Sequence, residues 1–176
     1  MDRRVQRTRR ALREALLALV LERGWERVSV RDVCAVADVG RSTFYSHFAD
    51  REELLLSGFD ELEAELRARD PRPLGFVAGL AEHVEQNRAL ARRVMSRRGG
   101  PPVRHRMSGL VVGLIEKDLA PLAPPSPVRT ATAHYLAGAL IDLLLWRLDD
   151  RSGMSIPETE ALFRRLSEPV LRSFAT

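Results

Sequence analysis

Apolar residues recur along this chain at the spacing of amphipathic α-helices. Between residues 8 and 23 they fall at i, i+3, i+4, i+7 and i+8, which forms a single stripe: Leu12, Ala15, Leu16, Leu19 and Val20. No stretch of useful length alternates polar and apolar residues as a half-buried strand would. The pattern therefore predicts an all-α protein, whose first helix runs over about residues 8–23 and ends at Gly24.

A capping signal marks the start of the next helix. The Ser29 hydroxyl can accept a hydrogen bond from the Asp32 amide, and the Asp32 carboxylate can reciprocate, as in a capping box. The inner face of this short helix would consist of Val30, Val33, Cys34 and Ala37. A tight connection follows at residues 38–40, where Asp38 can adopt a left-handed conformation at some cost relative to glycine.

Two further helices are expected before residue 70. One covers about residues 41–48, and its two phenylalanines, Phe44 and Phe48, share a face because they lie four positions apart. The other begins after Asp50, which can cap it with an acidic partner three positions later. Its apolar positions continue the helix through Leu66.

Proline- and glycine-rich segments divide the rest of the chain into longer helices. They are expected over about residues 74–97, which can break near Asn87, and over 104–119, 127–148 and 156–174. The expected architecture is all-α with about nine helices, a compact N-terminal three-helix unit joined to a longer helical bundle.

The excess positive charge lies at the amino end. The whole chain has a net charge of +4, and residues 1–51 carry 11 arginines against 7 acidic residues, whereas the remainder carries 17 residues of each sign. Such an asymmetry is expected if one end of the molecule meets a polyanion. The alternative is compositional bias, since Lys117 is the only lysine. That bias explains why arginine is used but not why the excess gathers at one end.

Several other function classes find little support in the sequence. No apolar run approaches the roughly 18 residues of a membrane span, and no secretory signal precedes the first helix, so a cytoplasmic location is expected. The single cysteine, Cys34, cannot form a disulfide within the chain and is expected to be buried. No nucleophile and base fall into a catalytic pattern, so we expect no enzymatic activity. None of the four histidines has a partner at metal-ligand spacing, so we expect no bound metal or cofactor; they are His47, His83, His105 and His134.

Two short helices joined by a tight turn, after a preceding helix, form the helix-turn-helix layout. The helix over residues 41–48 has one apolar face for docking and one face of hydrogen-bonding side chains: Arg41, Ser42, Thr43, Tyr45, Ser46 and His47. An arginine at the start of such a helix can form two hydrogen bonds with guanine in the major groove. Hydroxyl and imidazole groups suit phosphate oxygens, which position a protein without reading sequence.

The stretch over residues 28–54 resembles the DNA-binding signature of the TetR/AcrR family of regulators. The most specific part is Thr43-Phe44-Tyr45-x-His47-Phe48-x-Asp50-Arg51-x-x-Leu54. The resemblance covers about residues 5–65. It implies a helix-turn-helix DNA-binding domain there and a C-terminal helical domain over residues 66–176 that dimerises and binds a ligand.

The resemblance also implies roles for individual residues. Family members contact phosphate from the positions that match Ser29, Thr43, Tyr45, His47 and Arg51. They read bases from the positions that match Gly40, Arg41 and Ser42, and in some members an arginine arm, here Arg3, Arg4 and Arg7, enters the minor groove. The chain departs from the family where Asp38 replaces a usual glycine and Gly40 replaces a serine-like cap.

The two helices expected at the end of the chain resemble the family's dimer interface, although they could instead pack within one subunit. Dimerisation suits the function, because two recognition helices about one DNA turn apart read a palindrome. The resemblance further implies a small-molecule pocket among the helices between residues 74 and 148. Its candidate lining residues, each of which could equally be core, are Phe76, His83, Met95, Met107, Leu110, Leu114, Tyr135 and Trp146.

The sequence thus predicts a homodimeric regulator of transcription that binds double-stranded operator DNA. The favoured form is a repressor released by a small-molecule effector. The alternative is an effector-independent regulator or activator whose C-terminal domain only dimerises.

Overall fold

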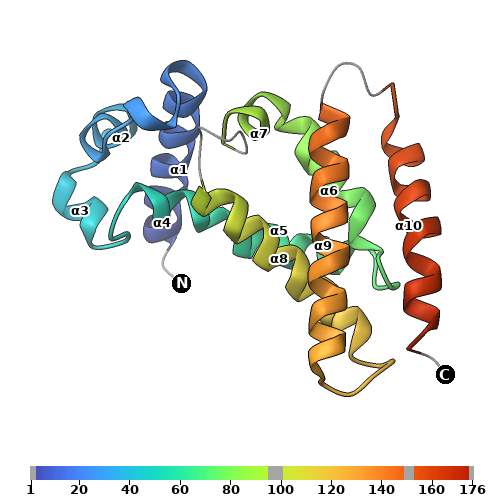
Figure 1. The fold of residues 1–176 in the computed structure, drawn as a ribbon. Helices are drawn as coiled ribbons and strands as arrows, with labels where there is room; N and C mark the ends of the chain where they lie inside the picture. The colour runs from blue at the N-terminus through green and yellow to red at the C-terminus, as the bar shows by residue number, and fades with distance from the viewer. Residues whose placement is uncertain (1–2, 95–100, 149–152, 175–176) are drawn as a thin grey trace. The chain divides into compact units, whose positions relative to one another are not determined.

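The computed structural model describes residues 3–94, 101–148 and 153–174, and in these residues the regular structure is entirely helical (Figure 1). The predicted all-α fold is confirmed. The elements are α1 (Arg3–Arg23), the 3₁₀ turn η1 (Trp25–Arg27), α2 (Val30–Ala37), α3 (Arg41–Tyr45), α4 (Arg51–Leu56), α5 (Gly58–Arg69), α6 (Phe76–Gln86), α7 (Arg88–Val94), α8 (Pro101–Leu119), α9 (Pro127–Leu148) and α10 (Ile156–Arg172). None of these helices is long and apolar enough to cross a bilayer.

The chain forms two compact units. The first comprises Met1–Asp60 and Ala89–Arg104, and the second comprises Glu61–Arg88 and His105–Thr176. The first unit therefore contains the helix-turn-helix segment, and the second contains α6, α9, α10 and most of α5 and α8.

Helix α1 supplies the core of the first unit. Its predicted stripe is buried, and Leu12, Leu16 and Val20 have no exposed surface. The helix packs against α2 and α4. It begins at Arg3, earlier than expected, because residues 3–7 contain neither glycine nor proline and include good helix formers. The arginines expected to form a minor-groove arm, Arg3, Arg4 and Arg7, accordingly lie within α1.

Local capping shapes the helix-turn-helix segment as the sequence predicted. The Asp32 amide donates to Ser29 Oγ at 3.2 Å, and the Ser29 amide donates to Asp32 Oδ2 at 2.9 Å, which completes the capping box of α2. Asp38 ends α2 in the left-handed region, with φ 53° and ψ 47°, and its amide donates to the Cys34 carbonyl. Asp38 therefore adopts the left-handed conformation that aspartate tolerates at some cost relative to glycine.

The helix predicted over residues 51–66 is divided in two. The Ser57 hydroxyl donates to the Leu54 carbonyl at 2.7 Å, and glycine follows at position 58. Serine bonded back to the preceding turn and glycine both weaken a continuous helix, so α4 ends at Leu56 and α5 begins at Gly58. The helix that follows the tight turn is also shorter than predicted. It ends at Tyr45, although the amide of buried Phe48 still donates to the Phe44 carbonyl at 2.9 Å.

In the second unit, α6, α9 and α10 pack against one another. The predicted break near Asn87 is present between α6 and α7, where the Asn87 side-chain amide donates to the His83 carbonyl at 2.9 Å. A second capping box, between Ser155 and Glu158, starts α10 as expected.

A partly buried clasp joins the loop before α6 to two later helices. Leu74 is buried with a positive φ of 58°, and its amide donates to Asp118 Oδ2 at 2.8 Å. The Arg164 guanidinium donates to the carbonyls of Pro73 and Leu74, at 3.2 and 3.1 Å. Burial raises the pKa of Asp118, although the Leu74 amide partly offsets this. The clasp thus fixes a strained backbone with hydrogen bonds from distant parts of the chain.

Candidate nucleic-acid interface

Helix α3 presents a polar face to solvent. Phe44 has no exposed surface, whereas Arg41, Ser42 and Thr43 are exposed and Tyr45 is 51% exposed. His47, in the turn after α3, is half-buried. The structure therefore brings these predicted contact residues to the surface of one short segment, opposite an apolar anchor.

Aromatic packing fixes the orientation of that anchor. The Phe44 and Tyr45 rings meet edge-on with centroids 5.3 Å apart, and the Phe44 and Phe48 centroids lie 5.9 Å apart. The Arg9 guanidinium of α1 lies 4.7 Å above the Phe48 ring. Because Phe44 is held on several sides, the polar residues beside it are held facing outward.

The amino end of α2 is already occupied by its own cap. Besides accepting the Ser29 amide, the Asp32 carboxylate accepts the Ser29 hydroxyl at 2.5 Å, and these bonds hold the pKa of Asp32 below its usual value. A carboxylate thus lies where a phosphate would bind a helix terminus. A contact between Ser29 and phosphate would have to compete with Asp32.

Gly40 is the N-cap of α3 and has an ordinary backbone, with φ −63°. A Cβ at this position would lie 3.8 Å from Thr43 Oγ1 and 3.9 Å from Ser42 Oγ, which is normal contact. Glycine is therefore not required by space or by backbone conformation. Its effect is to leave the start of α3 without a side-chain cap.

Arg51, expected to contact phosphate, makes three contacts within the protein. It is half-buried, and its Nη1 donates to the Trp25 carbonyl at 2.6 Å and to the Val28 carbonyl. Its guanidinium also lies 4.4 Å from the centroid of the Trp25 ring. Sequence reasoning missed these contacts because residues 25 and 51 are far apart in the chain.

The residues predicted to line a ligand pocket are dispersed. Phe76, Leu110 and Leu114 are buried core, Met107 is half-buried, and Met95 lies outside the described residues. Tyr135 and Trp146 are exposed. Of the candidates that the structure describes, only His83 borders the groove described next.

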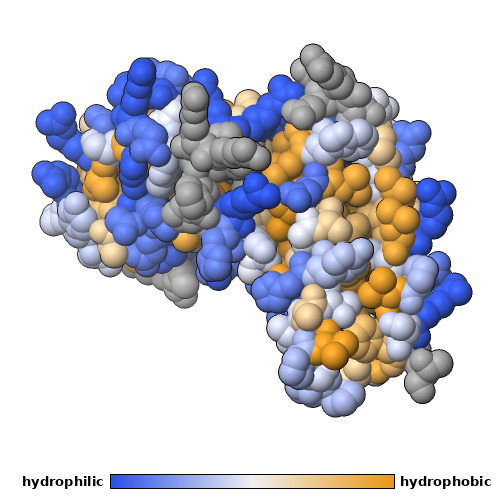
Figure 2. Space-filling model, in the orientation of Figure 1, coloured by the Kyte–Doolittle hydropathy of each residue, from blue (hydrophilic) through white to orange (hydrophobic). Residues whose placement is uncertain are grey.

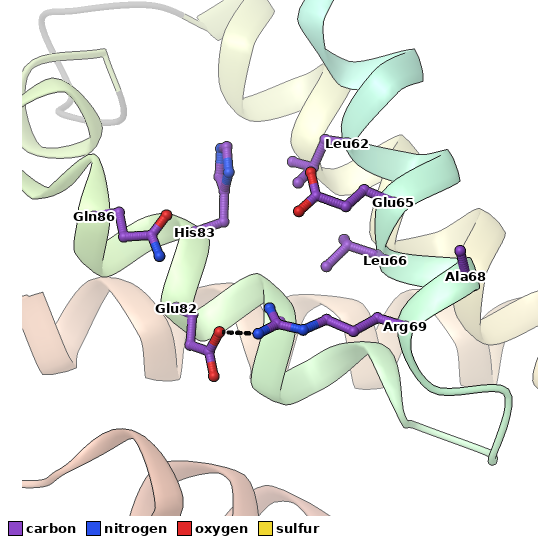
Figure 3. Close-up of a pocket in the computed structure, with 9 residues that line it drawn as sticks. Leu62, Glu65, Leu66, Ala68, Arg69, Glu82, His83 and Gln86 are labelled. Atoms are coloured by element: carbon purple, nitrogen blue, oxygen red, sulfur yellow. Dashed lines mark ion pairs between the residues drawn. The ribbon is translucent and has the colours of Figure 1, made fainter.

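An open groove of about 520 Å³ lies between α5 and α6 (Figure 3). Leu62 and Leu66 of α5 form apolar wall, and Arg69 pairs with Glu82 across the groove at 2.7 Å. Burial lowers the pKa of His83, which favours the neutral imidazole. The full lining is Leu62, Glu65, Leu66, Ala68, Arg69, Gly79, Glu82, His83 and Gln86. The helical spacing of Leu62, Leu66 and Arg69 was a signal for one wall, but the pairing of α5 with α6 was not visible in the sequence.

Helices α9 and α10 carry exposed apolar side chains. Tyr135 of α9 is 68% exposed and Leu166 of α10 is 64% exposed, and Val128 is similarly open. A Cβ at Gly138 would meet no atom within 4 Å. Figure 2 shows apolar surface over this part of the second unit.

In the described residues no three His, Cys, Asp or Glu side chains are grouped to hold a metal ion.

The fold and the exposed polar helix define a helix-turn-helix protein. Residues 12–57 match the family of bacterial regulatory proteins, tetR family. The HTH-type transcriptional regulator YxbF of Bacillus subtilis (strain 168) is 28% identical over 162 residues, which are 85% of this chain and 42% of YxbF, so the chain spans less than half of that relative.

Two solved structures have a similar fold over nearly the whole chain. A TetR transcriptional regulator from Streptococcus agalactiae 2603V is 26% identical with a TM-score of 0.71, and the match covers 94% of this chain and 96% of that one. Thermus thermophilus FadR, a TetR-family repressor in complex with lauroyl-CoA, shares the fold with a TM-score of 0.61 and 20% identity, over 90% and 92% of the two chains. Residues 12–57 thus match the DNA-binding region of the tetR family, and the fold of the chain is similar to that of TetR-family structures over nearly its whole length.

Proposed function

We propose that this protein is a transcriptional regulator that binds operator DNA through the domain at about residues 5–65. The observation that carries the proposal is the outward polar face of α3 on its buried Phe44 anchor. In this proposal Arg41 reads a base edge together with Ser42, while Thr43, Tyr45 and His47 contact phosphate. The exposure of Arg41, Ser42 and Thr43 supports these roles. The positive excess in residues 1–51 adds a sequence-independent attraction to DNA.

Selection of bound sites from random duplex DNA tests this function. We expect a short inverted repeat as the consensus, and binding that weakens as salt rises. The substitution Arg41→Ala should cost about 1–3 kcal/mol and relax preference at one base position in each half-site. The substitution Tyr45→Phe should weaken binding to all sequences alike, because it removes one phosphate contact. The absence of salt-sensitive binding to any duplex would refute the function.

We further propose that the protein acts as a homodimer through α9 and α10. The exposed apolar residues on these helices, including Tyr135 and Leu166, support this assembly. Small residues on α9 such as Gly138 permit close approach of a partner helix. A dimer supplies the two recognition helices that a palindromic site needs.

The form of regulation that we propose is a repressor released by a small molecule bound in the second unit. FadR, in complex with lauroyl-CoA, has the same fold, and the groove between α5 and α6 provides concave surface in this unit. An operator complex that dissociates on addition of a metabolite from a broad screen would support this form. An operator complex insensitive to every compound would favour the alternative, a regulator whose C-terminal unit only dimerises.

A further inference from the structure

The positive charge of Arg51 lies at the amino end of a helix, where a positive charge is unfavourable. Arg51 is the first residue of α4, where the amide ends of the helix already concentrate partial positive charge. A cation at this position is unfavourable unless other contacts compensate. The side chain is also half-buried, so it needs partners within the protein.

The compensating contacts all lie on one turn of the chain. Arg51 Nη1 donates to the carbonyls of Trp25 and Val28, which are the first residue of η1 and its C-cap. The guanidinium lies 4.4 Å from the Trp25 ring centroid, within the range of a cation–π contact. One side chain therefore holds both ends of η1 and the ring that projects from it.

This turn leads directly into the DNA-facing segment. Val28 immediately precedes Ser29, the N-cap of α2, and the residues before Arg51 include Phe48, which packs on the Phe44 anchor of α3. Asp50 caps α4 by accepting the Glu53 amide at 2.8 Å. Arg51 thus joins the amino end of α2 to the point where the chain leaves the recognition segment.

We propose that Arg51 is a positioning residue that fixes the start of α2 relative to the recognition segment and does not act by binding phosphate. The inference rests on the proposed DNA-binding function. The planar guanidinium can stack on an indole while one nitrogen donates to two carbonyls. A lysine ammonium keeps the charge but lacks this planar geometry.

Two substitutions separate positioning from phosphate binding. Arg51→Lys preserves a charge that can meet phosphate, whereas Arg51→Met removes the charge. For a positioning residue, both variants should lose about tenfold in operator affinity, with a similar loss. If Arg51→Lys binds like the parent protein, while Arg51→Met weakens binding and lowers the slope of log affinity against log salt by about 0.9, Arg51 is a phosphate ligand and the proposal is wrong.

A second measurement needs no DNA. In a Trp146→Phe background Trp25 is the single tryptophan, since the chain has two. We expect Arg51→Lys to shift Trp25 emission to the red and to increase its quenching by acrylamide, with the helical circular dichroism unchanged. Arg27→Lys, at an exposed arginine of the same turn, is the matched control and should change neither. Unchanged Trp25 emission in Arg51→Lys would overturn the positioning role of Arg51, whether or not the parent protein binds DNA. Failure of the parent protein to bind DNA would separately refute the proposed function.

Discussion

Asp38 shows how one residue sets the turn between α2 and α3. Its φ of 53° is unfavourable for most L-residues and tolerated best by glycine, asparagine and aspartate. We expect Asp38→Val to destabilise the protein by about 1–2 kcal/mol, because a β-branched side chain clashes in this conformation. The matched variant Asp38→Gly should stay within about 0.5 kcal/mol of the parent, since backbone relief offsets the entropy of the unfolded glycine. Urea unfolding of the three proteins checks the order, and equal stability of Asp38→Val and Asp38→Gly would contradict it.

His83 should make the protein less stable as the pH falls. Burial lowers its pKa from the usual 6.5, and Glu65 only partly opposes this effect. The unfolded chain therefore takes up the proton before the folded one does. Stability from this residue is fully present above pH 6.5 and declines as pH falls below it toward the folded-state pKa. We expect His83→Gln to show a smaller decline between pH 7.5 and pH 5.5 in thermal unfolding, and an unchanged decline would exclude His83 as its source.

At the residue scale, the sequence predicted those side-chain contacts whose partners lie close together in the chain. The capping box of Ser29 and Asp32 was predictable because both partners lie within one helical turn. The internal role of Arg51 was not, because its partners at Trp25 and Val28 lie 26 and 23 residues away.

Helices were predicted well where a long apolar stripe defines them. The stripe of α1 is buried as expected, and the limits of α9 agree with those predicted. The division of α4 from α5 at Ser57 was missed, because the apolar periodicity continues across a break that a single side-chain hydrogen bond accompanies.

Two helix glycines should respond in opposite ways to alanine. A Cβ at Gly75, the N-cap of α6, would lie 2.5 Å from Asp70 Cγ and 2.6 Å from the Asp70 carbonyl oxygen. We expect Gly75→Ala to destabilise the protein by about 1–3 kcal/mol through this clash. A Cβ at Gly109 in α8 would meet no atom within 4 Å, so Gly109→Ala should stabilise by about 0.5–1 kcal/mol. Calorimetry measures both, and a shift of the same sign for the two would be inconsistent with these environments.

For the whole molecule, the oligomeric state depends on the apolar face of α9 and α10. Leu166→Glu places a charge on this face at a residue that is already exposed in one subunit, so the subunit should still fold. We expect sedimentation to show a monomer and operator affinity to fall at least tenfold. Leu21→Glu, at an exposed leucine of α1, is the control and should stay dimeric. A dimeric Leu166→Glu protein would place the interface elsewhere.

The class of protein was predictable at this scale because the helix-turn-helix signature is continuous in sequence. The groove between α5 and α6 was not, because a concave surface depends on which helices pair. Of the residues proposed for a pocket, Leu110 and Leu114 are buried as core, as an apolar stripe alone would also require.

The clasp at Leu74 has a consequence for the order in which parts of the chain fold during synthesis. Both of its distant partners come late in synthesis: Asp118 lies 44 residues after Leu74, and Arg164 lies 90 residues after it. While the ribosome is still making the carboxyl-terminal residues, the strained Leu74 backbone lacks the bonds from Arg164. A nascent chain released before α10 should therefore be more open to proteases around residues 70–75, whereas the amino-terminal helices, whose contacts are local, can already have folded.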